Sequence, residues 1–350
     1  MSVSILPYGV TRQGRPVHCV AVQRGDMQLR AITYGAAITH LLVPDGMGRP
    51  VDVVLGYDTL AGYEQGTCYF GALVGRNANR VADARVRIDG TEYVLTANEG
   101  PKQHHGGFVG FDKRVFEAQP LGEWGVRFTY TSSDGEEGWP GEVRVQADYT
   151  LGEQGEVRLH YQASTTRPTL VNLTNHSYFN LAGHDAGAPA LLAHQARLDA
   201  DAFTPTGPDS LPTGEVRAVA GTPFDFTRPK PLGQDIGMPD TQLLQARGYD
   251  HNFVLRRPGP GLACCAQFES PLSGIGMRVY TTLPGMQMYT GNYLGPEPRG
   301  KGGAAYEPMG AVALETQFLP DSLHHPAFGD TVLRPGGRYD HTTVYQFFHK

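Results

Sequence analysis

Apolar and polar residues alternate along much of this chain, and this period of two restricts its fold more than any other feature of the sequence. Val126, Phe128 and Tyr130 alternate with polar neighbours, and the same pattern runs through residues 143–149 and 157–163. Successive side chains of a strand point to opposite faces of a sheet, so the alternation predicts half-buried β-strands. Gly (45 residues) and Pro (26) form about 20% of the 350 residues against an average of about 12%, and helices tolerate both poorly. The chain is therefore predicted to be all-β.

Turn residues separate the alternating segments. Asp89-Gly90 stands between two short alternating runs, and Asp-Gly in that position is the strongest short-range signal of a β-hairpin. No long window keeps a helical period, and the nearest candidate is residues 58–63, where Asp58 or Thr59 would cap a helical turn. We expect the helices to be short and few.

The composition gives no sign of a linker between domains, because the chain has no Ser/Gly tract, charge block or low-complexity segment. We therefore expect residues 1–350 to form a single domain. The widest irregular stretch is residues 201–248, which is rich in proline. A loop of this length in a compact domain is usually functional or covers an edge, so we expect it to line a site or to wrap the edge of a sheet.

The charge and the N-terminus argue against several classes of partner. A formal net charge of -6 and a pI of about 6.1 do not suit a protein that wraps a polyanion, so no nucleic-acid partner is predicted. No run approaches the ~18 apolar residues of a membrane span, and residues 1–7 lack the basic and apolar regions of a secretory signal. We expect a cytoplasmic protein without a membrane partner. Cys19, Cys68, Cys264 and Cys265 include no C-x-x-C pair and are predicted to be reduced thiols.

Polar residues that cannot build an apolar core gather in five places, which are residues 77–80, 104–107, 172–180, 249–252 and 314–317. Their amides, hydroxyls, imidazoles and charged groups suit a sugar, whose hydroxyls donate and accept hydrogen bonds at fixed angles. A buried hydrogen-bond network that braces a sheet would use the same side chains. Both interpretations stay open on the residues alone.

Glu315 and His176 are the candidates for proton chemistry. Glu315 directly follows the apolar residues 311–314, so it is either surface-facing at an alternating position or partly desolvated, which would raise its basicity. The histidines include no H-x-H, H-E-x-x-H or H-x-x-E-H spacing. The chain also lacks a G-x-S-x-G elbow, a P-loop and a strand-to-helix G-x-G-x-x-G. The sequence therefore predicts a site without a metal or a cofactor.

Taken together and in order, these segments resemble those of the aldose 1-epimerases, also called galactose mutarotases. The matching residues are 52–58, 75–81, 105–107 with 110–113, 175–181, 248–253, 284–292 and 314–317. The resemblance implies a large single-domain antiparallel β-sandwich, the galactose mutarotase-like supersandwich, with few short helices. It also implies an enzyme that binds a free aldose on an open concave face and interconverts its α and β anomers. Its partner would be a small-molecule sugar, and it would need no cofactor.

The same resemblance implies roles for individual residues. Glu315 matches the general base of the family and His176 its general acid. Arg80, His105 and Asp250 match the family residues that hold and orient the sugar. Asn79, Ser177, Tyr178 and Gln287 match positions that line the same pocket. The pair suits mutarotation, which needs a base for the proton on O1 and an acid for the ring oxygen O5.

One departure from the family pattern is His104, which precedes His105 where an apolar residue is common. We expect His104 at the surface or in packing, with a place beside the pocket as the alternative. Phe70, Tyr178 and Phe318 would form an apolar wall of the pocket or pack within the sheet.

Three other functions fit the same residues. A glycoside hydrolase would use Asp250 and Glu315 as its carboxylate pair. A non-catalytic sugar-binding module would bind without a poised Glu315, and a phosphosugar epimerase would need an additional Arg/Lys pair facing the pocket. The sequence leaves open the preferred aldose, among galactose, glucose, xylose and arabinose, and whether the protein is a monomer or a homodimer.

Overall fold

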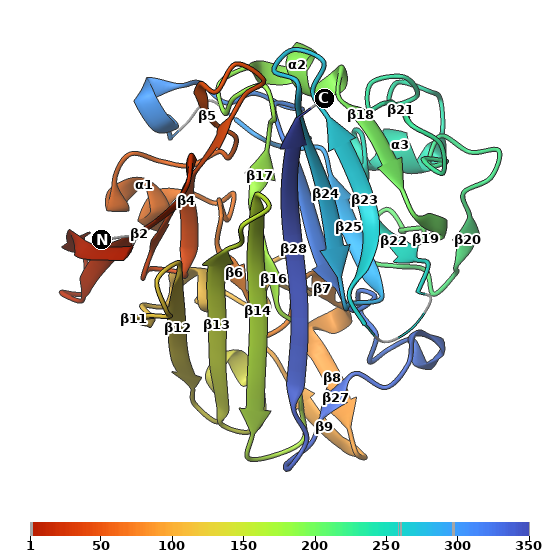
Figure 1. Ribbon diagram of the computed structural model, residues 1–350. Coiled ribbons are helices and arrows are strands. Elements are labelled where there is room, and N and C mark those ends of the chain that lie inside the picture. The colour runs from red at the N-terminus through yellow and green to blue at the C-terminus, as the bar shows by residue number, and fades with distance from the viewer. Residues whose placement is uncertain (1–2, 258, 260, 296–297, 350) are drawn as a thin grey trace.

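The alternating segments pair into one large antiparallel sheet in the computed structural model, which describes residues 3–257, 259, 261–295 and 298–349 (Figure 1). In spatial order the strands of this sheet are β11 (Glu117–Pro120), β12 (Gly125–Ser132), β13 (Val143–Leu151), β14 (Glu156–Thr165), β28 (Tyr339–His349), β24 (Ile275–Thr281), β23 (Ala263–Glu269), β18 (Gln195–Leu198) and β21 (Lys230–Pro231). β28, near the end of the chain, lies between β14 and β24 and joins the two halves of the sheet.

The register between β13 and β14 explains why this sheet has one buried face. Val145 pairs with Ala163, and both side chains are buried in the core. The next pair along the strands is Gln146 with Gln162, whose amides share a hydrogen bond of 3.2 Å. Because neighbouring residues of a strand face opposite sides, the apolar pairs face the core and the polar pairs face outward.

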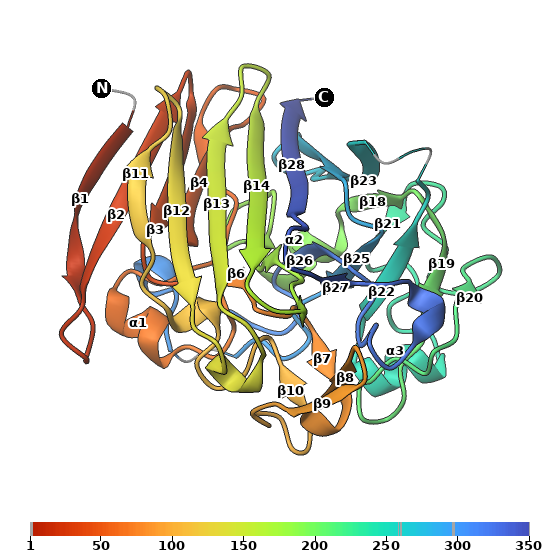
Figure 2. The same cartoon turned by 90° about the horizontal axis from the view of Figure 1, so that it is seen from below.

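Two further sheets of the described residues complete the sandwich. One has the order β17 (Tyr178–Phe179), β26 (Val312–Gln317), β25 (Gly285–Tyr289), β22 (Asp250–Leu255), β19 (Ala200–Thr204) and β20 (Arg217–Ala218). The other has the order β1 (Val3–Val10), β2 (Pro16–Arg24), β3 (Met27–Ile32), β4 (Ala37–Pro44) and β5 (Pro50–Asp52), and β2 contacts β12 and β13 (Figure 2). One apolar core contains residues of all three sheets, among them Leu29, Tyr149 and Leu314. The prediction of an antiparallel β-sandwich is confirmed.

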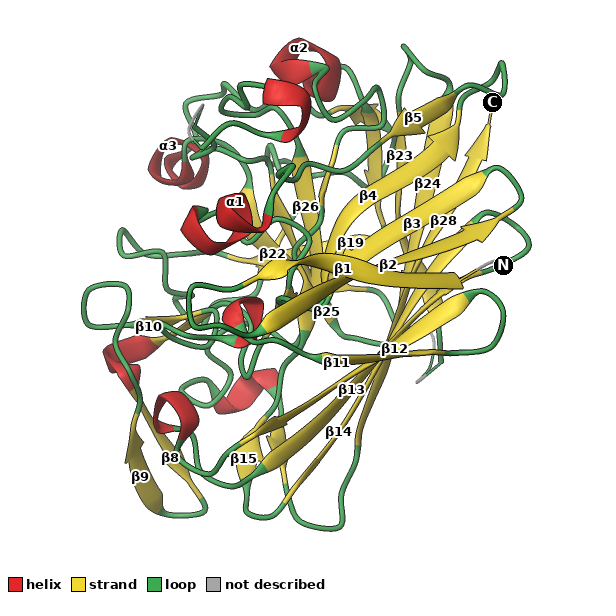
Figure 3. Cartoon of the chain, turned by 90° about the vertical axis from the view of Figure 1, so that its left-hand side faces the viewer, coloured by secondary structure: helices red, strands yellow, loops and turns green. Residues whose placement is uncertain are grey.

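Short strand pairs and helices gather toward one side of the long strands (Figure 3). The pairs are β6 (Leu73–Val74) with β16 (Thr174–Asn175), β7 (Arg80–Val81) with β10 (Gln103–His104), β8 (Arg85–Ile88) with β9 (Thr91–Val94), and β15 (Thr169–Leu170) with β27 (Val332–Leu333). Asp89-Gly90 forms the turn between β8 and β9, as predicted.

The helices are short, as the sequence indicated. In the described residues the α-helices are α1 (Leu60–Gln65), α2 (Gly187–Leu192) and α3 (Thr241–Ala246), and the 3-10 helices are Ala82–Ala84, Phe111–Lys113, Glu136–Gly138, Lys301–Gly303 and Pro326–Phe328. The side chain of Thr59 caps α1 by accepting a hydrogen bond from the backbone of Gly62, which confirms the expected helical turn. α2 and α3 were not expected, because fewer than two turns carry no sustained period. Among the described helices, none is both long and apolar enough to cross a bilayer.

The irregular stretch 201–248 covers sheet edges. It supplies β20 and β21, which are the last strands of their sheets. The Gln242 side chain in α3 bonds the backbone of Thr206 twice, accepting from its N–H at 2.7 Å and donating to its carbonyl at 2.9 Å. The same amide oxygen lies 3.2 Å from His251 Nε2 in β22. Of the two expected roles, wrapping an edge is therefore the correct one.

A tight turn at residues 69–72 fixes the backbone around His176. Gly71 N–H donates to the His176 carbonyl at 3.0 Å, and His176 N–H donates to the Ala72 carbonyl at 2.9 Å. The Asn175 amide donates to the Gly71 carbonyl at 2.7 Å. Gly71 has φ of +66°, and a Cβ there would overlap the carbonyl group of Ile38. Only glycine fits this position without strain.

Gly71→Ala is expected to lower the free energy of unfolding by roughly 2–5 kcal/mol, because a left-handed alanine costs about 1–2 kcal/mol and an overpacked contact about 1–3 kcal/mol. Urea denaturation followed by circular dichroism would measure the change. The matched control is Gly25→Ala, since Gly25 has φ of +56° and open space where its Cβ would lie. Equal losses in the two variants would contradict the proposed overlap with Ile38.

Candidate active site

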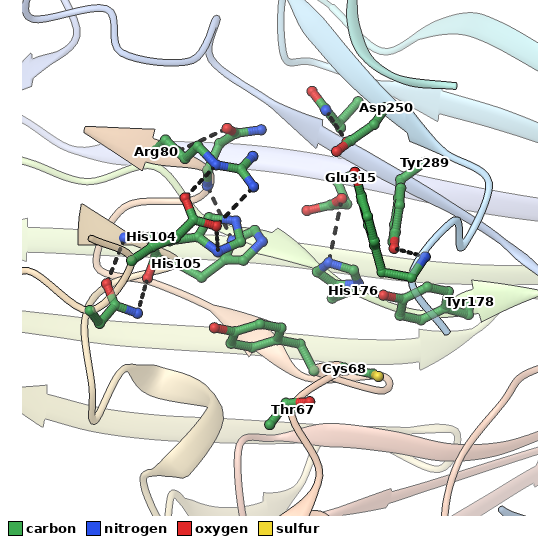
Figure 4. A pocket seen from close by; sticks show the side chains of 16 residues that line it. Thr67, Cys68, Arg80, His104, His105, His176, Tyr178, Asp250, Tyr289 and Glu315 are labelled. Carbon is green, nitrogen blue, oxygen red and sulfur yellow. Dashed lines mark hydrogen bonds and ion pairs between the residues drawn. The ribbon is translucent and has the colours of Figure 1, made fainter. Parts of the chain in front are cut away.

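The polar segments of the sequence converge on one cavity of about 330 Å³, a size typical of small-molecule sites (Figure 4). The six-stranded sheet contributes one wall through Tyr178 of β17, Glu315 of β26, Gln287 and Tyr289 of β25, and Asp250 of β22. Connections and short strands contribute the rest of the lining, which is Thr67, Cys68, Tyr69, Asn79, Arg80, Asn98, Glu99, His104, His105, His176 and Tyr293. The irregular residues 201–248 line no part of it within the described chain.

Glu315 faces the cavity because of strand alternation. Its neighbour Leu314 packs in the core, and its other neighbour Thr316 bonds Thr343 through their hydroxyls at 2.5 Å. The Glu315 side chain is only 3% exposed. Of the two expectations for this carboxylate, the desolvated one is correct. Burial raises the pKa of Glu315 to about 8; the charge of Asp250 adds to this rise, and Arg80 opposes it.

His176 is the nearest proton carrier to Glu315. Its Nε2 lies 3.5 Å from Glu315 Oε1, and its side chain is 4% exposed. Burial lowers the pKa of His176 to about 4. The two groups therefore hold one proton between them near neutral pH, so one of them can donate a proton while the other accepts one.

Two tyrosine rings contact the His176 imidazole. The Tyr69 ring is stacked on it at a centroid distance of 5.7 Å and an interplanar angle of 24°, and the Tyr178 ring lies 4.9 Å away at 31°. Tyr69 has φ of +56°, an uncommon conformation for a bulky residue. This ring contact and the backbone bonds of the turn 69–72 fix the position of His176.

The environment of His105 settles which ring nitrogen carries its proton. The backbone N–H of Asn79 donates to His105 Nδ1 at 3.2 Å, so the proton of the neutral ring is on Nε2. Burial also lowers the pKa of His105 well below its usual range, which keeps the ring neutral. His105 is thus a hydrogen-bond donor through Nε2.

A metal would need different protonation at this site. One potential ligand atom from each of His105, His176 and Glu315 lies within 4.8 Å of the others, and two imidazoles with a carboxylate can bind zinc. A metal on His105 Nε2 would have to displace the proton that the Asn79 bond fixes there. The donor set therefore fits proton transfer and hydrogen bonding better than it fits a metal.

Other charged and amide side chains line the cavity near the Glu315–His176 pair. Arg80 forms a two-bond fork with Glu99, with Nε–Oε2 at 2.7 Å and Nη2–Oε1 at 3.0 Å. Gln287 Nε2 donates to Asp250 Oδ1 at 2.6 Å. Burial raises the pKa of Asp250, and the Arg80 charge opposes this rise.

The structure brings together eight of the nine residues that the sequence selected, and Ser177 is the exception. Ser177 lies between His176 and Tyr178, which both line the cavity, so alternation turns its side chain to the other face. It is buried, and its Oγ has no hydrogen-bond partner in the described protein. Ser177 is therefore not a lining residue.

The structure also decides between the expected places of three other aromatic residues. His104 lies in the cavity wall, with its ring 3.8 Å from that of His105, rather than at the surface. Phe70 packs behind Tyr178 at 5.2 Å, and Phe318 packs on Tyr339 at 6.0 Å, so neither forms the pocket wall. Of the three expected wall residues, only Tyr178 faces the cavity.

Sequence reasoning missed several lining residues, which are Thr67, Cys68, Tyr69, Asn98, Glu99, Tyr289 and Tyr293. Tyr289 could have been predicted from the sequence, because it follows Gln287 by two residues in a matched segment and so lies on the same face of the strand. Glu99 carries no such signal, since it lies in a loop.

Comparisons with known proteins identify the family of the chain. A family model described as aldose 1-epimerase matches residues 18–346. Over 326 residues the chain is 45% identical to a galactose mutarotase of Bos taurus, which covers 93% of this chain and 92% of that protein. The chain belongs to the aldose 1-epimerase family. It is also 34% identical over 337 residues to an aldose 1-epimerase of Escherichia coli (strain K12), covering 95% and 96% of the two chains.

A solved structure confirms the family fold. The aldose epimerase homologue of C. elegans superposes with a TM-score of 0.85 at 29% identity, over 99% of both chains. The expectation of a galactose mutarotase-like supersandwich is confirmed. As a member of the family, the protein is an isomerase that interconverts the anomers of aldoses.

The shared proton predicts a bell-shaped pH dependence of kcat/KM. Glu315 and His176 together hold a single proton between about pH 4 and about pH 8. Below this range a second proton removes the base, and above it the loss of the shared proton removes the acid. Polarimetry of a freshly dissolved aldose would measure the profile, with the rate in buffer alone subtracted at each pH. A rate that stays constant well above pH 8 would contradict the shared proton.

Proposed function

We propose that this protein interconverts the α and β anomers of free aldohexoses, galactose and glucose among them, with Glu315 as general base and His176 as general acid. The observation that carries the proposal is the buried Glu315–His176 pair, 3.5 Å apart inside the cavity. The choice of galactose is supported by the relatives, which include galactose mutarotases of Bos taurus and Homo sapiens.

The two pKa values place the shared proton mainly on Glu315 near neutral pH, and the reaction begins from the minor form of the pair, in which Glu315 is ionised and His176 holds that proton. Glu315 takes the proton from the O1 hydroxyl while His176 delivers its proton to O5, and the C1–O5 bond breaks. The free aldehyde turns about C1–C2, and the ring recloses on the other face. On reclosure the two groups exchange roles, so the enzyme gains no net proton. Each positioned acid or base typically contributes about 10²–10⁴-fold to the rate.

The remaining residues are proposed to hold the sugar. His105 Nε2–H and the Arg80 guanidinium donate hydrogen bonds to sugar oxygens, and Asp250 accepts from hydroxyls. The Gln287 carbonyl and the Asn79 side chain add polar contacts, and the Tyr178 ring offers an apolar face to the sugar C–H groups. Ser177 makes no such contact, since its side chain lies outside the lining.

The charges of the cavity argue against a phosphosugar substrate. Among the described lining residues, Arg80 is the one Lys or Arg side chain, and Glu99 already binds it. Three carboxyl groups, those of Glu99, Asp250 and Glu315, line the same space. The additional Arg/Lys pair that a phosphate requires is absent from this part of the described chain.

The organisation of the whole chain stays a proposal. A single domain is supported by one apolar core that includes residues from Val20 to Phe347. The choice between monomer and homodimer and the cytoplasmic location stay predictions from the sequence.

Glu315→Gln and His176→Asn are each expected to lower kcat for mutarotation by about 10²–10⁴-fold, because each removes one proton-transfer group and keeps a polar side chain of similar size. Polarimetry of α-D-galactose and α-D-glucose at neutral pH would measure the rates, and isothermal titration calorimetry would check that both variants still bind sugar. Full activity in either variant would contradict the assigned pair. A wild type that does not accelerate mutarotation would overturn the proposed function.

Galactose 6-phosphate is expected to react with a kcat/KM about 10²-fold or more below that of galactose, because the one Arg among the described lining residues is already bound by Glu99 and does not balance the charge of the dianion. The matched control is 6-deoxygalactose, which lacks the 6-hydroxyl but carries no charge. Equal kcat/KM for the phosphate and galactose would show that the charge of the cavity does not select substrates.

A further inference from the structure

Glu99 faces three basic side chains at the wall of the cavity. Its carboxylate forms the fork with Arg80, lies 3.0 Å from Lys102 Nζ and lies 3.6 Å from His104 Nδ1. The side chain is 35% exposed, so it is at the boundary between the cavity and solvent. Nothing in the general acid–base mechanism uses this residue.

The backbone holds Glu99 in a two-residue hairpin turn. Its N–H and carbonyl each bond the backbone of Lys102 at 3.1 Å, around Gly100, which has φ of +59°. The preceding residue, Asn98, donates to the carbonyl of His104 at 3.0 Å and accepts from its N–H at 2.7 Å. The turn and the segment that carries His104 and His105 are therefore tied together, and the Glu99 carboxylate has a defined position.

This bidentate ion pair with Glu99 determines which guanidinium nitrogens of Arg80 remain to bind a sugar. In the described residues the side-chain hydrogen bonds of Arg80 both go to Glu99, through Nε and Nη2. Arg80 lines the cavity, and its Nη1 is the guanidinium nitrogen that makes no hydrogen bond within the described protein. A planar guanidinium held by two parallel bonds to a carboxylate loses its freedom to rotate, so its remaining donors point in a fixed direction.

The same fork balances the charge near Glu315. Several groups face Glu315: Asp250, Arg80, His176, His105 and Tyr178 in the cavity lining, and Tyr345 in the core, whose phenol donates to the Leu314 carbonyl. Asp250 raises the pKa of Glu315 and Arg80 lowers it. A carboxylate bound to Arg80 offsets its positive charge, so less of that charge acts on Glu315.

We propose that Glu99 is a positioning residue of this epimerase, which aims the Arg80 guanidinium at the sugar and offsets its charge so that Glu315 stays a strong base. The inference rests on the proposed function, since it assumes that Glu315 is the base.

Two substitutions separate the charge of Glu99 from its geometry. Glu99→Gln keeps the length of the side chain and removes the charge, so Arg80 lowers the pKa of Glu315 further. The basic limb of the pH profile then moves to lower pH, and kcat/KM falls by roughly 10- to 100-fold as the charge-assisted bonds are lost. Glu99→Asp keeps the charge but is too short for both bonds. Its basic limb stays in place while KM rises.

Polarimetry of α-D-galactose over the full pH range, with kcat and KM fitted separately, would measure both effects. The matched control is Glu215→Gln, which breaks a similar fork with Arg217, at 2.9 and 2.7 Å, on exposed residues outside the cavity lining. It is expected to leave kcat/KM and the basic limb unchanged. Thermal melting of every variant identifies a temperature at which all of them are folded, and the mutarotation rates are compared at that temperature.

The proposal is overturned if Glu99→Gln has the kcat/KM and the basic limb of the wild type. It is also overturned if both Glu99 variants lower only the melting temperature, because that result would make Glu99 purely structural. These outcomes differ from a failure of the proposed function, in which the wild type itself would not accelerate mutarotation or Glu315→Gln would stay active.

Discussion

Glu315 places a carboxylate in a cavity where only 3% of its side chain reaches solvent, and the rest of the site is arranged around that burial. Removing a carboxylate from water is costly unless nearby groups compensate, so an unpaired Glu315 would destabilise the strand that carries it. His176 compensates by sharing a proton with it, and Arg80 by its positive charge. The same desolvation raises the pKa of the carboxyl group. The feature that costs folding free energy is therefore the one that makes the group a useful base.

Strained backbone conformations at the site are a second feature that lowers the stability of the fold. Tyr69, Asn79 and His105 all have positive φ, between +49° and +66°. Each such residue costs roughly 1–2 kcal/mol, and it persists only where surrounding bonds fix it. Here the Asn79 carbonyl accepts from His105 N–H at 3.1 Å, and the Tyr69 carbonyl accepts from Ala72 N–H at 3.0 Å. The sandwich supplies the stability that holds these strained residues around the cavity.

The sequence predicted much of the site and little of its surroundings. Glu315, His176 and the sugar-holding residues were found because seven ordered segments resemble one family, and eight of the nine selected residues line the cavity. Ser177 was misplaced because a matching segment does not show which of its residues share a strand face. Glu99 and Tyr69 were missed because loop residues have no period, and their roles arise from contacts with Arg80 and His176.

By itself, the sequence determined the all-β class, the strands β12 to β14, the Asp89-Gly90 hairpin and the helical turn that begins near residues 58–59, because alternation, turn residues and caps act over a few neighbouring residues. Only the tertiary structure decided which side chains meet. Glu315 and His176 are distant in the chain, and their 3.5 Å separation follows from strand order and register. The proton affinity of Glu315 likewise depends on how many atoms from separate segments exclude water from it. No local pattern contains that quantity, because it is a property of the assembled cavity.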